Sequence, residues 1–131
     1  MWYTLFALTA GLQEAKNRSL KLGDIKPENV FVNDAGQIKV ANIYSWPNEK
    51  PSYWKVIEFD KFESDSLLAP EDMALLQTNH LDNDGNEKSE IFAIGATIIC
   101  TAILDNFSSV YNFKEKAINI GPLRDKKMAF G

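Results

Sequence analysis

Three polar side chains in one short segment form the chemically most suggestive grouping of the chain. The segment Asp24-Ile25-Lys26-Pro27-Glu28-Asn29 carries a carboxylate, an ammonium group and a side-chain amide. Phosphoryl transfer uses a carboxylate to orient the attacking hydroxyl, a lysine to offset phosphate charge and an amide oxygen to hold Mg²⁺. Asp24, Lys26 and Asn29 match these needs. The same residues can also serve the loop alone, with Asp24 accepting backbone N–H groups and Asn29 tying the loop to its neighbours.

The elements on either side of this segment must position it. An amphipathic helix is predicted for residues 2–18, because apolar side chains recur there at helical spacing: Leu5, Leu8, Leu12 and Ala15. After the segment, two β-branched runs at residues 30–32 and 38–40 flank the turn-like sequence 33–36. This pattern predicts a small β-hairpin.

The rest of the chain predicts a long connection and three further helices. Residues 42–68 contain no clear pattern beyond a possible strand at 53–59. A short helix is predicted to open at residues 69–72, with a proline and acidic residues in its first turn. The most apolar helix is expected to begin at Ser89 as its cap and to form the central core. A weaker amphipathic helix is predicted for residues 108–118.

These landmarks follow one another in a recognisable order. The segment 24–29, the hairpin, Ala69-Pro70-Glu71 and the run Lys88-Ser89-Glu90-Ile91-Phe92-Ala93-Ile94-Gly95 together resemble the C-terminal lobe of a eukaryotic protein kinase of the Ser/Thr type. The resemblance covers roughly residues 2–120. It implies a mainly α fold with a small β-hairpin (α+β), a truncated kinase-like lower lobe. It also implies one domain over residues 1–131, without the upper lobe and the late helices, in which 42–68 corresponds to the activation segment.

The resemblance assigns roles to individual positions. Asp24 and Lys26 match catalytic residues, and Asn29 and Asn42 match the positions that bind the metal-nucleotide cofactor. The structural positions are Leu22, Glu71, Glu90, Phe92 and Gly95. Glu90 is expected to accept hydrogen bonds from the loop around Leu22 and Gly23. Glu71 is expected to stay exposed, to pair with a cation such as Arg124, or to pair with another chain.

Several positions depart from the kinase pattern. Leu22-Gly23-Asp24 stands where kinases have His-Arg-Asp, and Asn42-Ile43-Tyr44 stands where they have Asp-Phe-Gly. Asn42 lacks a charge worth about 4 kcal/mol per unit of cation charge at ~4 Å and an effective dielectric of ~20. Half of the nucleotide site is also expected to be missing, since nothing before residue 2 corresponds to the upper lobe. We therefore expect catalysis to be vestigial and no cofactor or metal to bind, and we interpret Phe31 as a core aromatic.

Composition narrows the range of partners and compartments. The 131 residues carry a formal net charge of −4, which argues against binding nucleic acid by bulk charge. No run reaches the about 18 apolar residues of a membrane span. Cys100 is the only cysteine, so it cannot form an internal disulfide, and it is expected to be a small buried hydrophobe. The chain is expected to be intracellular, in the cytoplasm.

The resulting functional hypothesis is a non-catalytic, pseudokinase-like fragment that acts as a structural or scaffolding subunit of a larger assembly. Its upper and lower faces should be covered by other protein subunits. Large aromatics are the candidate anchors: Trp2, Tyr3, Phe6, Trp46, Tyr53 and Trp54. Two alternatives remain open. One is a piece of a Ser/Thr kinase that binds Mg-ATP once the missing lobe is supplied, and the other is a regulatory decoy for a kinase or its substrate.

Overall fold

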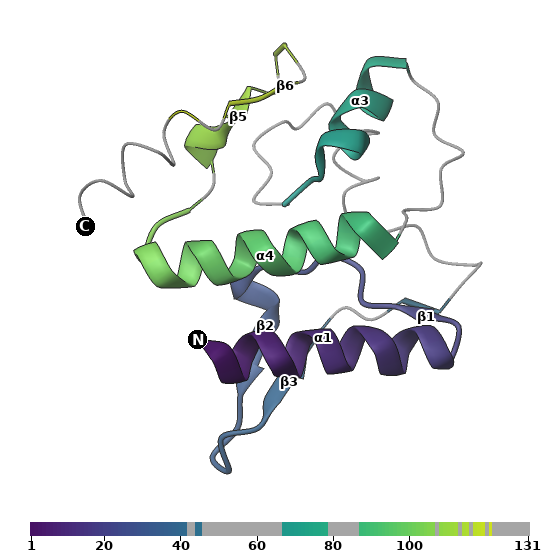
Figure 1. Ribbon diagram of the computed structural model, residues 1–131, viewed down its shortest axis with the longest axis vertical. Coiled ribbons are helices and arrows are strands. Elements are labelled where there is room, and N and C mark those ends of the chain that lie inside the picture. The colour runs from purple at the N-terminus through teal and green to yellow at the C-terminus, as the bar shows by residue number, and fades with distance from the viewer. Residues whose placement is uncertain are drawn as a thin grey trace.

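The computed structural model describes residues 1–41, 44–45, 67–78, 87–106, 108–112, 114–115, 117–119 and 121. Two long helices dominate this part of the chain, α1 (Trp2–Asn17) and α4 (Glu87–Ile103). They lie side by side and run in opposite directions (Figure 1). Short antiparallel sheets and a third helix surround them, which confirms the α+β class. The assignment of residues 1–131 to one domain stays a prediction.

Helix α1 forms as the spacing of its apolar residues predicts. Leu8, Leu12 and Ala15 lie on one face and are buried, with Leu8 completely excluded from solvent. Residues four apart share a helix face, so this face packs against α4 and the strand that follows α1. The predicted helix at residues 2–18 is thereby confirmed to within one residue.

Helix α4 forms the centre of the core, but mainly through its smaller side chains. Its buried residues include Ala93, Ile94, Ala96 and Cys100, whereas Ile91 and Ile99 are 53% and 41% exposed. The burial of Cys100 confirms its prediction. Small side chains on the buried face let the antiparallel α1 approach closely.

The predicted cap at Ser89 is wrong. Ser89 lies inside α4, which already includes Glu87 and Lys88. Its hydroxyl group lies within hydrogen-bond distance of the carboxylates of Glu71 and Asp72. Serine favours a cap because its oxygen can accept from free N–H groups, and here the hydroxyl serves as a donor.

The described strands form three two-stranded antiparallel sheets, where the sequence predicted one hairpin. The predicted hairpin is confirmed as β2 (Val30–Val32) and β3 (Ile38–Val40). Its turn contains Gly36 at φ +75°, a conformation that glycine adopts without steric cost. A second pair joins β1 (Leu20–Lys21) to β4 (Tyr44–Ser45).

The third sheet replaces the helix predicted for residues 108–118, which is wrong. A 3₁₀ turn at Ser108–Val110 leads into β5 (Tyr111–Asn112), which pairs with β6 (Ala117–Ile118). The Asn112 side chain accepts a hydrogen bond from the Glu115 N–H and donates one to the Glu115 carboxylate. Such local side-chain bonds compete with helix formation, and they close the turn here.

The short helix predicted after residue 69 is confirmed as α3 (Pro70–Thr78). Met73 on α3 is buried beside Leu68. The possible strand at 53–59 and most of the activation-segment-like stretch 42–68 lie outside the described residues. The second half of the polar segment forms a 3₁₀ turn, Pro27–Asn29, which leads directly into β2.

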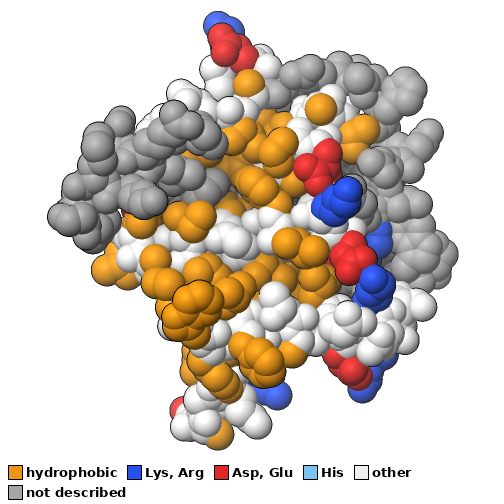
Figure 2. Space-filling model, viewed as in Figure 1, with side chains coloured by type: hydrophobic (Ala, Val, Ile, Leu, Met, Phe, Trp, Pro, Cys, Tyr) orange, Lys and Arg blue, Asp and Glu red, His pale blue; other side chains and the backbone are white. Residues whose placement is uncertain are grey.

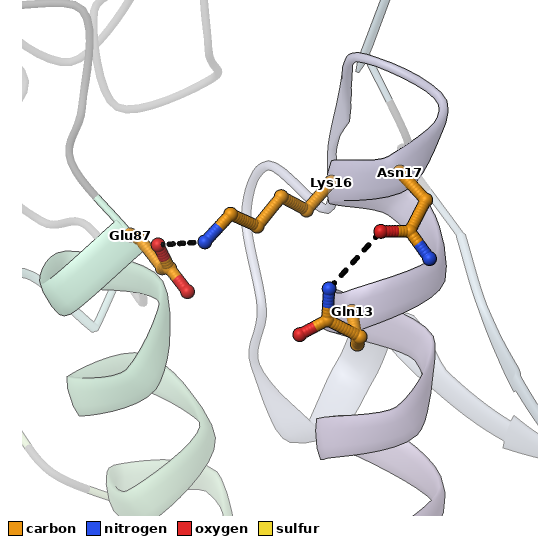
Figure 3. A network of polar contacts seen from close by, with 4 residues as sticks. All are labelled: Gln13, Lys16, Asn17 and Glu87. Carbon is orange, nitrogen blue, oxygen red and sulfur yellow. Dashed lines mark hydrogen bonds and ion pairs between the residues drawn. The ribbon is translucent and has the colours of Figure 1, made fainter.

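A polar contact on the surface joins the ends of the two long helices (Figure 3). Lys16 Nζ at the end of α1 donates to Glu87 Oε2 at the start of α4 over 2.7 Å, and both side chains are about half exposed. On α1, Gln13 Nε2 donates to Asn17 Oδ1. Exposed ion pairs contribute about 0–1 kcal/mol, so this contact adds little to stability.

Two helical glycines offer a stability prediction. No neighbouring atom of the described structure lies within 4 Å of a Cβ built on Gly11 in α1 or on Gly95 in α4. Replacing either glycine by alanine should therefore raise the free energy of unfolding, by about 0.5–1 kcal/mol, because the unfolded chain loses freedom and no clash arises. Urea denaturation of the two single variants measures this. A loss of stability for Gly95→Ala alone would indicate that position 95 requires glycine.

Candidate functional site

The polar segment lies between β1 and β2, and its first turn depends on glycine. Gly23 has φ +72°, and the N–H of Ile25 donates to the Gly23 carbonyl over 3.0 Å. A residue with a Cβ is disfavoured in this left-handed conformation by about 1–2 kcal/mol. Glycine therefore suits the observed backbone at position 23, which the sequence resemblance matched to an arginine of kinases.

The three side chains singled out in the sequence meet in the structure. Lys26 Nζ lies 3.1 Å from Asp24 Oδ2. Asn29 Nδ2 donates to the Asp24 carbonyl over 2.7 Å and also lies 3.5 Å from Asp24 Oδ2. Asp24 and Asn29 are buried, at 7% and 8% exposure. We call these three residues the loop cluster.

The loop cluster is also joined to the end of the hairpin. The N–H of Ala41, directly after β3, donates to the Asn29 carbonyl over 2.9 Å. The chain therefore leaves β3 beside Asn29. The other expected cofactor position, Asn42, is the next residue and lies outside the described residues.

The Glu90 side chain on α4 accepts hydrogen bonds from the backbone just before the polar segment. Its Oε1 accepts a hydrogen bond of 2.7 Å from the N–H of Leu22, and its carboxylate also accepts from the N–H of Gly23. Burial raises the pKa of the Glu90 carboxyl, and these two hydrogen bonds oppose the rise. This is the contact that the sequence analysis expected, and it joins positions 68 residues apart.

A second polar cluster, missed in the sequence analysis, joins α3 to α4. Ser89 Oγ lies 3.1 Å from Asp72 Oδ1 and 3.3 Å from Glu71 Oε1. Asp72 Oδ2 accepts from the N–H of Ala69, as an acidic residue at the third helical position does in a capping box. Burial raises the pKa of Asp72. The acidic first turn of α3 was the available signal, but it was interpreted only as complementing the helix dipole.

The remaining predicted positions have mixed outcomes. Leu22 is buried at 2% exposure, and Phe92 packs partly buried against the core. Glu71 is half-buried against Ser89, and its suggested partner Arg124 lies outside the described residues. The interpretation of Phe31 as a core aromatic is wrong, since it is 53% exposed. Side chains alternate along a strand, and Val30, the residue before it on β2, takes the core position.

Comparison with known proteins identifies no family: no family model, no curated protein and no solved structure matches the chain. Among the described residues, no group of three His, Cys, Asp or Glu side chains is arranged to hold a metal ion. None of the described helices has the length and apolar character needed to cross a membrane. The cytoplasmic location stays a prediction.

The two buried carboxyl groups give the stability a predictable pH dependence. The pKa values of Asp72 and Glu90 are raised above their ordinary values of 3.8 and 4.5. Between the ordinary and the raised values, the folded chain binds more protons than the unfolded chain, so stability should fall as pH rises through this window. Urea denaturation from about pH 4 to about pH 7 measures the slope. Asp72→Asn should reduce it, and an unchanged slope would contradict the role of Asp72.

Proposed function

We propose that the chain is a non-catalytic, kinase-lower-lobe-like protein that acts as a structural or scaffolding subunit. The observation that carries this proposal is that the side chains of the loop cluster bind one another, with Asp24 buried among them. The Asp24 carboxylate is 7% exposed and is paired with Lys26 at 3.1 Å. Groups that a phosphotransferase directs at substrate and phosphate bind each other here, which supports a role in holding the loop.

The sequence adds two chemical reasons. Asn42 stands where a kinase has the metal-binding aspartate, and a neutral amide holds Mg²⁺ more weakly than a carboxylate. Gly23 lacks the guanidinium that pairs with an activation-segment phosphate. Both changes remove charge that phosphoryl transfer and its regulation require.

An exposed apolar surface supports the scaffolding part of the proposal. Trp2, Tyr3 and Phe6 on α1 are 83%, 58% and 72% exposed. In Figure 2, hydrophobic side chains gather where the N-terminal half of α1 lies. Contiguous exposed apolar surface marks protein interaction sites, and aromatic residues supply much of the binding energy at such sites. Trp46, Tyr53 and Trp54, the other suggested anchors, lie outside the described residues.

The test is nucleotide binding by the purified chain. A fluorescent ATP analogue should give no Mg²⁺-dependent signal with the wild-type chain. The same measurement on the Asn42→Asp variant is the informative comparison with the wild-type chain, because this substitution restores the negative charge at the position where a kinase holds Mg²⁺. Mg²⁺-dependent binding to the wild-type chain that Asn29→Ala abolishes would overturn the non-catalytic assignment.

The loop cluster also favours a second candidate, a Ser/Thr kinase piece whose other lobe is supplied by a partner. Lys26 Nζ and Asn29 Nδ2 lie 3.1 and 3.5 Å from Asp24 Oδ2, so the lysine and the amide that phosphoryl transfer needs both lie beside the carboxylate. This candidate predicts Mg-ATP-dependent phosphate transfer to protein Ser or Thr by the native complex. The activity should be lost in a complex carrying Asp24→Asn, whereas activity independent of Asp24 would come from another protein.

A further inference from the structure

The first three turns of α1 expose a row of uncharged side chains spaced four residues apart. Trp2, Phe6 and Ala10 are all exposed, and residues at this spacing form a ridge along one helix face. The next two residues at this spacing, Glu14 and Arg18, are charged and form an ion pair of 2.6 Å, so the uncharged row ends at Ala10. We call Trp2, Phe6 and Ala10 the apolar ridge.

The apolar ridge is complementary to itself. When two copies of α1 cross antiparallel with Phe6 at the two-fold axis, Trp2 of each copy faces Ala10 of the other. The largest side chain then meets the smallest, and the two Phe6 rings pair across the axis. A two-fold interface requires such self-complementarity, since each patch contacts its own copy.

Polar groups beside the apolar ridge do not oppose this arrangement. Tyr3 of one copy faces Thr9 of the other, and the Thr9 hydroxyl already donates to the carbonyls of Leu5 and Phe6 within its own helix. Glu14 lies about 12 Å along the helix from Phe6, beyond the overlap of the two ridges. Along α1, this arrangement therefore brings no two like charges together.

The exposed area is of the size that a weak dimer needs. Large aromatic side chains bury about 150–250 Å² each, so the exposed fractions of Trp2, Tyr3 and Phe6 correspond to roughly 320–530 Å² per copy. Two copies can then bury roughly 640–1,060 Å², a range whose upper end reaches the about 1,000 Å² of a small specific interface.

We infer that the chain forms a two-fold homodimer through the apolar ridge of α1. The inference rests on the proposed scaffolding function and names a second copy as one partner of its exposed surface. Since each copy has a net charge of −4, added salt should strengthen the dimer by screening long-range repulsion.

Sedimentation equilibrium of the full chain, from about 1 to about 200 µM, tests the inference over the range expected for a weak interface. The wild-type chain should show reversible monomer–dimer exchange. Phe6→Lys should weaken the dimer at least about thirtyfold, because it brings two ammonium groups to the axis. An equimolar mixture of Phe6→Lys and Phe6→Glu should restore it, because opposite charges then meet.

Ile91→Lys is the matched control, since Ile91 is an exposed apolar residue near the opposite end of the helix pair. It should leave the dimer unchanged. Circular dichroism checks that each variant is folded, and Ala10→Lys replaces Phe6→Lys as the disrupting variant if the latter unfolds. A monomer at the highest concentration, an oligomer larger than a dimer, or equal disruption by Ile91→Lys would overturn the inference.

The outcome is separate from that of the nucleotide experiment. If the chain is a monomer and binds no Mg-ATP, the homodimer inference is wrong and the non-catalytic assignment stands. If the chain is a dimer and binds Mg-ATP, the homodimer inference stands and the non-catalytic assignment is wrong.

Discussion

Replacing Glu90 by alanine is expected to lower the free energy of unfolding by about 3 kcal/mol. The Glu90 carboxylate accepts from the backbone N–H groups of Leu22 and Gly23. Leu22 is buried, so its N–H has little access to water once the carboxylate is removed. A buried donor without an acceptor costs about 1–3 kcal/mol, and the relief of burying the carboxylate offsets part of the sum.

Two conservative variants separate the hydrogen bonds from the charge. Glu90→Gln keeps one acceptor oxygen at the same reach and should lose about half as much stability as Glu90→Ala. Glu90→Asp places the carboxylate one methylene further from Leu22 and should also fall between wild type and alanine. If all three variants unfold at the same urea concentration as the wild type, Glu90 does not support the loop.

The elements recognised in the sequence are those specified by local patterns. Helix α1 and the β2–β3 hairpin each contain a complete periodic signal within a short window. The β5–β6 hairpin does not, because its strands are two residues long and Lys114 and Glu115 between them are good helix formers. Contacts distant in sequence favour the hairpin, such as the bond from the Tyr111 hydroxyl to the Leu68 carbonyl. Local propensity cannot report such contacts.

The contacts of the candidate site also divide into those that the local sequence indicates and those that it does not. Asp24, Lys26 and Asn29 could be grouped from the sequence because they lie in one short segment, residues 24–29. The contact of Glu90 with Leu22 was expected only because of the kinase resemblance, since no local rule links residues 68 positions apart. The contact of Ser89 with Asp72, on two separate helices, had no such guide and was missed.

Replacing Asp24 by alanine is expected to lower the free energy of unfolding by about 2 kcal/mol. The substitution leaves the Lys26 ammonium without the carboxylate that lies 3.1 Å from it. Breaking a buried ion pair costs about 3–5 kcal/mol, and the 19% exposure of the Lys26 side chain lets it turn towards water and reduces that cost. The bond from Asn29 to the Asp24 carbonyl survives, because it uses the backbone.

A double-mutant cycle with Lys26→Met determines what the pair does. Lys26→Met keeps the length of the side chain and leaves the Asp24 carboxylate buried without its cation, so it should also be destabilising. The double variant Asp24→Ala/Lys26→Met should be more stable than the sum of the single losses predicts, with a coupling of about 1–2 kcal/mol. Such a coupling means that the stability contributed by each group depends on the presence of the other. A coupling near zero, or a gain in stability for Asp24→Ala, is instead the behaviour of groups held ready for a substrate, and it would favour the kinase alternative over the scaffold.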